Sequence, residues 1–369
     1  MNTKIIEVRD RIHRAARTIG RPIALMEICG THTVAIFRHG IRSLLPETIR
    51  LISGPGCPVC VTSQGYIDGV VDLARRKDVI LATYGDMIRV PGGRSSLEQA
   101  RGDGAEVVAV FSANDAVQLA RDNPARTVVF AGVGFETTAP ATAAAILAAE
   151  QDGLANFLVL TAHKFVLPAM KALLEGGQIR VDGFICPGHV SVILGWQAYE
   201  PIVRGYNQPC AVAGFEPMQI LSAIAAILEM HVARRAEVIN VYQGIVSPGG
   251  NVHARQLLDK VFEPADAPWR GLGTIPLSGM AIRPAWRPFD ATERFGPVET
   301  TNTDPPGCRC GQVVKGLIEP PACPLFGQTC NIYHPVGPCM VSSEGACAAW
   351  FKYGPYAAGH RQTQASKSK

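Results

Sequence analysis

Short apolar runs alternate with longer amphipathic stretches over most of the chain. Runs such as DVILAT, TVVFAG and FLVLTA are rich in branched and aromatic residues and end in glycine or a polar turn. Strands of a parallel sheet are buried on both faces by helices, so they show continuous apolar runs instead of alternation. The pattern therefore predicts an α/β fold built on doubly wound parallel sheets.

Two parts of this region resemble each other and predict two similar α/β domains. The stretch SGPGCPVCV, a helix and the strand DVILATYG are similar to CPGHVSVIL, a helix and the strand CAVAGF. We place the first domain at residues 20–150 and the second at 151–285. In open parallel sheets the carboxyl ends of the strands meet at one edge, where ligands usually bind. The two domains are thus expected to share a cleft at these edges.

Proline and glycine become dense from Glu263 to Gly307 and strand-like runs nearly vanish, which indicates an extended connector that leads into a third unit. We assign it residues 286–369, with the N-terminal helix predicted for residues 1–19 as a candidate to pack on it. Six cysteines lie between Cys308 and Cys347. A segment this small and poor in apolar periodicity rarely holds together by its core alone. A bound metal or cluster is therefore expected to stabilise it.

The spacing of these C-terminal cysteines favours an iron–sulfur cluster over zinc. Thiolates suit both, but a structural zinc site usually takes close CxxC pairs, and this segment contains none. Wide gaps fit a [4Fe–4S] cluster, in which each iron takes one thiolate. Zinc and unpaired buried thiols remain the alternatives. Spacing alone does not choose four ligands from the six candidates, Cys308, Cys310, Cys323, Cys330, Cys339 and Cys347.

Cysteines near the N-terminus follow two other predicted strands. Cys57 and Cys60 form a CxxC in GPGCPVCV, where the start of a helix would lower the pKa of a thiol. The pair would act in redox chemistry or hold a metal, unless it is an incidental turn. Cys29 ends the run LMEIC, and His32 follows three residues later. A thiolate and an imidazole there would form an iron pocket, although a lone cysteine is often only a small buried hydrophobe.

Acidic and imidazole side chains follow further predicted strands and crowd the same edge of the sheets. They are Asp86, Glu136, His163, His189 and Glu216. Each of them could instead cap the helix that follows it. Their concentration near the cysteines favours one shared site.

Charge and hydropathy argue against two classes of protein. The formal net charge is only +4, and no dense stretch of Lys and Arg with interleaved aromatic residues is present, so we expect no nucleic-acid partner. No uninterrupted apolar run approaches the ~18 residues of a membrane span, and the charged N-terminus lacks the features of a signal peptide. The chain is therefore predicted to be cytoplasmic, where disulfide frameworks are rare.

Several motifs together resemble one known family. The runs EICGTHTVAIFRHGIRSLLP and ISGPGCPVCVT, the turns GFETTAP and ICPGHVS, and the tail segments CPLFGQTC and VSSEGACAAW span about residues 20 to 355. In this order they resemble the HypD family of [NiFe]-hydrogenase maturation factors. The resemblance implies two similar α/β domains and a third domain with a [4Fe–4S] cluster.

The resemblance also implies a function and partners. Members of the family help to build the Fe(CN)2CO group of [NiFe] hydrogenases. They act with a HypC-type small chaperone, which shares the iron. A HypE-type partner delivers cyanide from a thiocyanate on its C-terminal cysteine.

Carried over to this sequence, the resemblance assigns the iron site to Cys29 beside His32. It assigns the redox CxxC to Cys57 and Cys60, which are further candidates to bind iron. Other polar residues would hydrogen-bond the cyanide ligands or orient them. These are Asp86, Glu136, His189 and Glu216.

The family's cluster pattern, C-x14-C-x6-C-x16-C, also has a match in this chain. It falls on Cys308, Cys323, Cys330 and Cys347. Cys310 and Cys339 lie outside it and receive no ligand role. The choice between Cys308 and Cys310 is the most open of these assignments.

These roles combine into one hypothesis and leave two rivals. Electrons from the cluster would reach the iron site through the Cys57–Cys60 dithiol and drive the transfer of cyanide. The first rival is an iron–sulfur thiol–disulfide reductase that acts on a protein disulfide, in which Cys29 has no role. The second is an assembly scaffold whose cluster is only structural, in which Cys57 and Cys60 are dispensable.

Overall fold

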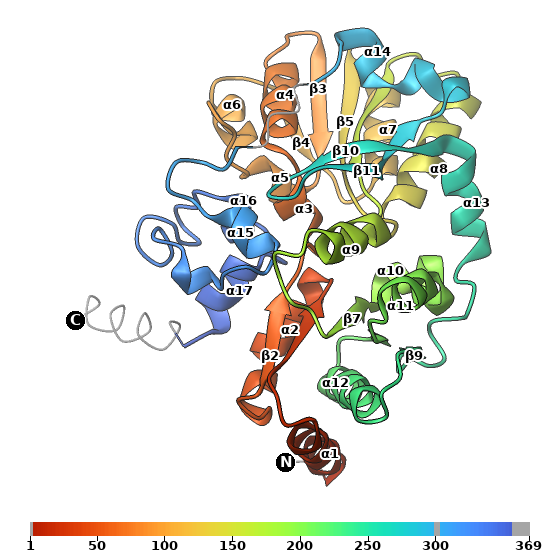
Figure 1. The fold of residues 1–369 in the computed structure, drawn as a ribbon. Coiled ribbons are helices and arrows are strands. Elements are labelled where there is room, and N and C mark those ends of the chain that lie inside the picture. Colours follow the sequence, from red (N-terminus) through yellow and green to blue (C-terminus); the bar gives the residue numbers. More distant parts are fainter. Residues whose placement is uncertain (1–2, 299–302, 356–369) are drawn as a thin grey trace.

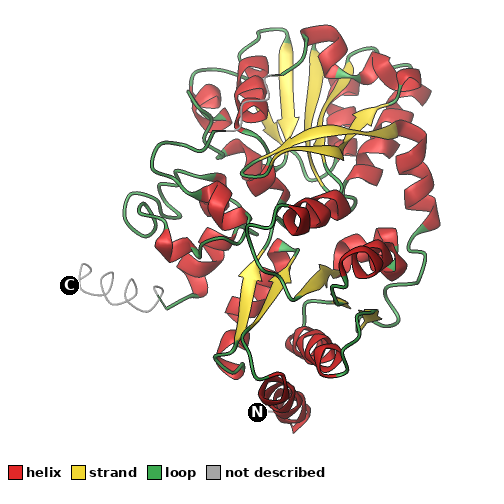
Figure 2. Ribbon diagram, viewed as in Figure 1, coloured by secondary structure: helices red, strands yellow, loops and turns green. Residues whose placement is uncertain are grey.

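The computed structural model describes residues 3–298 and 303–355. The predicted α/β class is confirmed, because two parallel sheets of five and four strands are flanked by helices (Figure 1, Figure 2). The predicted N-terminal helix and third unit extend beyond this part of the chain. Their residues 1–2, 299–302 and 356–369 lie outside the described residues.

The strands are those that the apolar runs indicate. The five-stranded sheet has the order β2-β1-β7-β8-β9, with β1 (Ile23–Glu27), β2 (Ile49–Ser53), β7 (Gly183–Pro187), β8 (Cys210–Ala213) and β9 (Val238–Asn240). The four-stranded sheet has the order β4-β3-β5-β6, with β3 (Val79–Thr83), β4 (Val107–Ala109), β5 (Thr127–Gly134) and β6 (Phe157–His163). Every residue of β3 and β5 is buried, as expected for strands covered on both faces.

The two sheets do not follow the domain boundary expected near residue 150. Strands β1 and β2 come early in the chain but share a sheet with β7, where Leu25 aligns with Gly183. The chain thus starts in one sheet, builds the other over residues 79–163, and returns to the first. Buried parallel strands have similar apolar runs, so periodicity identifies them without indicating which of them pair.

Helices connect these strands and cover the sheets. They are α4 (Gln64–Ala74), α5 (Gly85–Ile88), α6 (Leu97–Gly102), α7 (Ala113–Asp122), α8 (Ala139–Gln151), α9 (Val166–Glu175), α10 (Gly188–Leu194), α11 (Glu200–Tyr206), α13 (Val252–Val261) and α14 (Ala291–Phe295), with the 3-10 turns η1 (Ile41–Leu44), η2 (Trp196–Tyr199) and η3 (Pro284–Phe289). Among the helices of the described residues, none has both the length and the apolar character needed to cross a bilayer.

The cysteine-rich unit, described over residues 303–355, contains only short helices. They are α15 (Cys310–Val314), η4 (Pro320–Ala322), α16 (Pro338–Val341) and α17 (Ala346–Tyr353). The unit packs against α2 (Gly30–Arg38) and α3 (Pro58–Val61), which follow β1 and β2 (Figure 1). It therefore lies at the carboxyl edge of the five-stranded sheet.

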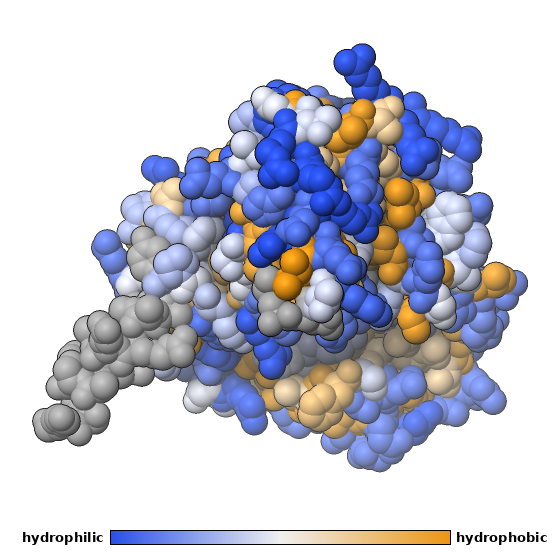
Figure 3. Space-filling view, turned by 90° about the horizontal axis from the view of Figure 1, so that it is seen from below, coloured by the Kyte–Doolittle hydropathy of each residue, from blue (hydrophilic) through white to orange (hydrophobic). Residues whose placement is uncertain are grey.

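Helix α1 (Thr3–Ile19) packs on α12 (Pro217–Val232) and not on the cysteine-rich unit. Its buried residues Val8 and Ile12 repeat at helical spacing. Arg11 donates two hydrogen bonds of 2.8 Å to the Glu229 carboxylate of α12. The N-terminal helix therefore completes the core on one face of the five-stranded sheet. Its outer face is polar, and Figure 3 shows mainly hydrophilic residues nearest the viewer on this side of the molecule.

An antiparallel hairpin lies where the sequence indicated an extended connector. It consists of β10 (Phe262–Trp269) and β11 (Gly273–Ile282). Single bridges join Thr62 to Trp269 and Lys164 to Gly279, so the hairpin ties together the ends of α3 and β6. Three prolines interrupt its sequence. Proline cannot donate to a ladder of hydrogen bonds, which explains why these runs did not indicate strands.

Candidate functional site

The carboxyl edge of the five-stranded sheet gathers most of the predicted site residues. Cys29 follows β1, Cys57 follows β2, His189 follows β7 and Glu216 follows β8. Strand β1 leads to β2 on one side and borders β7 on the other, so the strand order reverses there. Open parallel sheets bind ligands at such a reversal. Cys29 therefore lies where the topology of this sheet favours a site.

Cys29 lies in a tight backbone environment. It precedes α2 with an extended backbone, and its side chain is 8% exposed. The loop after β2 approaches it closely, since a Cβ on Gly56 would lie 2.2 Å from Cys29 N. A Cβ on Gly30 would likewise lie 2.4 Å from Glu344 O. Only glycine fits at these positions, so the CGTH and GPGC motifs pack backbone to backbone.

The Cys29 thiol keeps its proton at neutral pH. Burial raises its pKa to about 11, and the charge of Glu344 acts in the same direction. Backbone N–H groups of Thr31 and His32 at the start of α2 oppose this shift. A soft metal that binds Cys29 must therefore displace the proton. Thr31 Oγ1 donates to Glu344 Oε1 at 2.6 Å, which holds that carboxylate beside the cysteine.

The His32 ring is buried and fixed by the backbone. Its Nε2 lies 3.0 Å from Gly214 O, so Nε2 is assigned the proton and donates it. Nδ1 is then an acceptor with no partner among the described residues. Burial lowers the pKa of His32 to about 4, so the ring is neutral at physiological pH. Phe215 packs against both His32 and His189. The site thus contains a buried, neutral imidazole nitrogen that suits a metal or a hydrogen-bond donor.

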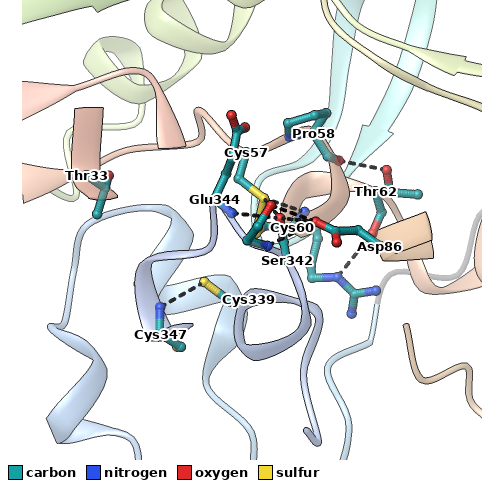
Figure 4. Close-up of a disulfide and its surroundings, with 12 residues drawn as sticks. Thr33, Cys57, Pro58, Cys60, Thr62, Asp86, Cys339, Ser342, Glu344 and Cys347 are labelled. Carbon is teal, nitrogen blue, oxygen red and sulfur yellow. Dashed lines mark hydrogen bonds between the residues drawn. A yellow bond between two sulfur atoms is a disulfide. The ribbon is translucent and has the colours of Figure 1, made fainter. Parts of the chain in front are cut away.

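Cys57 and Cys60 form a disulfide, with their Cα atoms 5.3 Å apart (Figure 4). Pro58 starts the short helix α3, and the Cys60 N–H donates to Cys57 Sγ at 3.2 Å. The two cysteines are only 5% and 2% exposed. An external thiol therefore reaches this disulfide only after the chain that covers it moves.

A covering loop, residues 342–344, links the disulfide to the other sheet. Ser342 Oγ lies 3.3 Å from Cys57 Sγ, and Figure 4 shows this serine beside the disulfide. Asp86 follows β3 of the four-stranded sheet and accepts hydrogen bonds from the Ser343 N–H and hydroxyl at 2.9 and 3.0 Å. Glu344 acts on the Cys29 thiol. One loop of the cysteine-rich unit therefore reaches Cys29, the disulfide and Asp86.

Glu136 and Glu216 contact the starts of helices instead. Glu136 Oε1 accepts from the Val166 N–H of α9 at 3.0 Å, and its Oε2 is buried without a partner among the described residues. Burial raises the pKa of Glu136 to about 7. Glu216 is exposed and is the N-cap residue of α12. Both positions correspond to helix capping, and a role of either residue toward iron stays a prediction.

Six cysteines of the cysteine-rich unit surround one apolar cavity, Cys308, Cys310, Cys323, Cys330, Cys339 and Cys347. All but Cys308 are buried. Thiols from several loops around a common centre are the donor set of a cluster, in which each thiolate binds its own iron. Within residues 3–298 and 303–355, no group of three or more His, Cys, Asp or Glu side chains is arranged to hold a single metal ion. The cavity measures about 10 Å³, so these side chains must move outward for anything larger than a water to enter.

Cys310 and Cys339, which the family pattern leaves outside the ligand set, are part of this group. The thiol of Cys339 contacts those of Cys310 and Cys347, and the Cys347 N–H donates to Cys339 Sγ at 3.4 Å. Both α15 and α16, which carry Cys310 and Cys339, pack on α3. The helices that carry these two thiols are therefore the ones that join the cysteine group to α3, which holds Cys60. The only feature of the sequence that could have indicated Cys310 and Cys339 is that this unit has more cysteines than the four positions of the family pattern.

Two carboxylates near Cys29 were not predicted. Glu344 lies in the motif VSSEGAC but received no role. Glu27 ends β1, is 0% exposed, and accepts a hydrogen bond from Ser53 Oγ at 2.9 Å. Burial raises its pKa. An acidic residue inside the apolar run IALMEIC was the signal that could have identified it, since Glu is rarely fully buried.

Comparison with known proteins identifies the family. The sequence profile described as HypD: Hydrogenase formation hypA family matches residues 3–354. The Hydrogenase maturation factor HypD of Escherichia coli (strain K12) is 44% identical over 350 residues, or 95% of this chain and 94% of that protein. The protein of the same name from Azotobacter vinelandii is 47% identical over 341 residues, or 90% of each chain. The chain belongs to the HypD family of hydrogenase maturation factors.

Proposed function

We propose that this chain is a cytoplasmic scaffold on which the Fe(CN)2CO group of [NiFe] hydrogenases is assembled. The observation that carries the proposal is the covering loop, through which Cys29, the Cys57–Cys60 disulfide and the cysteine-rich unit meet. Membership of the HypD family supports a role in hydrogenase maturation. The proposed partners are a HypC-type chaperone that shares the iron and a HypE-type protein that delivers cyanide.

Iron enters this scheme as cargo, held by the Cys29 thiolate together with a ligand from the chaperone. A thiolate is a soft donor that suits low-spin iron carrying cyanide and carbonyl. The surroundings of Cys29 are buried, which strengthens hydrogen bonds to these ligands. His32 and His189 pack on the same Phe215 ring and are the proposed residues that orient them. Asp86 would act through the covering loop, which it holds in place.

The Cys57–Cys60 pair supplies both electrons and both protons for the release of cyanide in this scheme. A protein-bound thiocyanate reacts with the dithiol to give a thiol on the donor protein, hydrogen cyanide and the Cys57–Cys60 disulfide. The sulfur–carbon bond breaks, the disulfide bond forms, and the two thiol protons pass to the donor sulfur and to cyanide. The disulfide in the structure corresponds to the oxidised end of this cycle.

The cysteine-rich unit is proposed to hold a [4Fe–4S] cluster through Cys308, Cys323, Cys330 and Cys347. When bound, the cluster supplies the electrons that return the disulfide to the dithiol. The chain contributes an apolar lining of several thiols and a direct contact of α15 and α16 with α3. This packing shortens the path between the proposed ligands and the disulfide.

Replacement of Cys29 tests the iron scaffold. After co-expression of all partners, the complex with the HypC-type chaperone is purified without oxygen and examined by infrared spectroscopy. We expect cyanide and carbonyl stretches from the wild type and their loss in Cys29→Ala. Cys186→Ala, at another buried free cysteine, is the matched control and should retain them. Full maturation of hydrogenase by Cys29→Ala would refute the proposal.

An iron–sulfur thiol–disulfide reductase is the second candidate, because it uses the same disulfide and the same cysteine-rich unit. It is less favoured because it gives Cys29 no role, although the loop that leads to Cys57 packs backbone to backbone on Cys29. This candidate predicts that Cys29→Ala keeps full activity. A scaffold with a purely structural cluster predicts instead that Cys57→Ser and Cys60→Ser leave maturation intact.

A further inference from the structure

A cavity of about 240 Å³ lies between the end of β6 and the hairpin β10–β11. Lys164 lines it, and most of the other lining is apolar, including Tyr66, Ala162, Ala267, Pro268 and Met280. None of the residues assigned above to iron, to the disulfide or to a cluster lines this cavity. It is therefore a separate feature of the molecule.

The backbone of Lys164 is fixed where β6 ends. Its N–H donates to Gly134 O at 3.0 Å, and the residue pairs with Gly279 of β11. The side chain is only 3% exposed, and Nζ lies 5.6 Å from the centre of the Trp269 ring. The ammonium is thus held at an aromatic face inside the fold instead of extending into water.

Lys164 has no counter-charge within the described residues. No carboxylate forms an ion pair with it, and burial alone accounts for the shift of its pKa. The two carboxylates that line the cavity are engaged by backbone groups. Asp266 Oδ1 accepts from the Leu277 N–H at 3.0 Å, and Asp290 Oδ1 accepts from the Thr292 N–H at 2.8 Å. An ammonium that is almost completely removed from solvent and has no counter-charge is unfavourable.

The neighbouring His163 carries no charge of its own. Its ring nitrogens lie 3.0 Å from Thr161 Oγ1 and 3.3 Å from Thr142 Oγ1. Burial lowers its pKa to about 3, and the charge of Lys164 acts in the same direction. The neutral His163 ring therefore does not attract an anion and provides no counter-charge for Lys164.

We propose that this cavity binds a small organic monoanion, whose carboxylate pairs with the Lys164 ammonium while its apolar body packs on Tyr66 and Met280. Such a ligand supplies the missing counter-charge through a charge-assisted hydrogen bond. The cavity is smaller than the ~300–1,000 Å³ of sites for drug-sized ligands, so the anion must be small. Asp266 and Asp290 disfavour a second negative charge. The proposal is independent of the iron scaffold.

The affinity of this site depends on the protonation of Lys164. Burial lowers the pKa of Lys164 to about 8. The ammonium attracts a carboxylate and the neutral amine does not, so the affinity is highest below this value and falls as the pH rises through it. The other ionisable groups around the cavity are Asp266, Asp290, Tyr66 and His163, and burial moves the pKa of the last two away from this range.

Calorimetric titration of benzoate into the full-length protein tests the proposal. We expect benzoate to bind the wild type at pH 7, and to bind Lys164→Met at least tenfold more weakly. From pH 7 to pH 9 the protonated fraction of Lys164 falls about tenfold, and the wild-type affinity should fall with it. Lys260→Met is the matched control, because Lys260 Nζ lies 5.7 Å from the Trp286 ring but its side chain is exposed.

Benzamide, the uncharged analogue of benzoate, separates the contribution of the charge pair with Lys164 from that of apolar packing. We expect it to bind weakly and equally to the wild type and to Lys164→Met. The proposal is wrong if benzoate does not bind the wild type, or binds Lys164→Met equally well. If Lys164→Met does not fold, the wild-type pH series decides, and an affinity that is constant from pH 7 to pH 9 rejects the proposal.

Discussion

Gly56 and Cys29 approach each other so closely that no side chain fits between them. A Cβ on Gly56 would lie 2.2 Å from Cys29 N and 2.4 Å from Cys29 Cα. Both atoms belong to the backbone, so neither can rotate away. We expect Gly56→Ala to lower the free energy of unfolding by ~1–3 kcal/mol and to weaken the binding of iron. Denaturant unfolding and iron content after anaerobic purification measure the two effects.

The matched control for this substitution is Gly205→Ala in α11. A Cβ there meets nothing within 4 Å, and alanine is favoured over glycine inside a helix by ~0.5–1 kcal/mol. Gly205→Ala should therefore leave the stability unchanged or raise it. If Gly56→Ala were as stable as the wild type, the loop after β2 could move away from Cys29 without loss of stability, contrary to this prediction.

Glu136 makes the stability of the fold depend on pH. Burial raises the pKa of its carboxyl to about 7, above the ~4.3 of an exposed glutamate in the unfolded chain. The folded state binds this proton more tightly than the unfolded chain does. The stability that the protonated carboxyl contributes is therefore fully present below the unfolded pKa and is lost as the pH rises through 7. Glu136→Gln keeps an acceptor for the Val166 N–H and removes the charge. We expect it to add up to ~3 kcal/mol at pH 8 and little at pH 4.

Urea unfolding of Glu136→Gln and wild type at several pH values measures this difference. Glu150→Gln, at an exposed residue of α8, is the control and should show no such trend. A difference that stays constant with pH would mean that the carboxyl of Glu136 ionises as an exposed one does. Its buried Oε2 would then require another explanation.

At the level of elements, the sequence predicts strands better than their pairing. The fully buried β5 follows directly from its apolar run, whereas the pairing of β1 with β7 depends on contacts between distant segments. The positions of Cys29 and Cys57 at one edge were predictable, because the carboxyl ends of parallel strands in one sheet point the same way. His189 joins them in this sheet only through the pairing of β7 with β1. The contact of Ser342 with Cys57 was not predictable, because no local pattern encodes a contact between residues so far apart in the chain.

The covering loop is held over the disulfide by Asp86. One oxygen of this carboxylate accepts hydrogen bonds from the Ser342 hydroxyl and from the N–H and hydroxyl of Ser343. Each such bond contributes ~1 kcal/mol net, so Asp86→Ala should raise the open fraction of the loop about tenfold or more. We expect dithiothreitol to reduce the Cys57–Cys60 disulfide correspondingly faster, as thiol labelling over time would measure.

A control for Asp86→Ala is available at the start of α7. Asp115 also accepts two backbone hydrogen bonds through one oxygen, from Phe111 and Ser112 at 2.9 Å each. Asp115→Ala removes the same kind of contact without touching the covering loop. It should leave the rate of reduction unchanged, and equal rates in all three proteins would mean that the loop does not control access.

At the scale of the whole molecule, the cysteine-rich unit depends most on its contacts with other units. Within residues 303–355 its longest helix is α17, with 8 residues, and its buried cysteines share a hydrophobic core with Val61 of α3 and Phe184 of β7. A unit with so little regular structure gains much of its stability from a bound cluster. We therefore expect that loss of the proposed cluster loosens residues 303–355 while both sheets remain folded.

Serine substitutions test both the cluster and its ligands. If Cys308, Cys323, Cys330 and Cys347 bind the [4Fe–4S] cluster, each serine variant should lose visible absorbance and iron and become sensitive to proteolysis within residues 303–355. Cys310→Ser is the decisive comparison, because Cys310 lines the same cavity and is more deeply buried than Cys308. Cys310→Ser should keep the cluster. Loss of iron in Cys310→Ser with retention in Cys308→Ser would mean that Cys310, and not Cys308, is the ligand. Retention of iron in all five variants would exclude a cluster held by these thiols and leave the unit to be stabilised by packing on α2 and α3 alone.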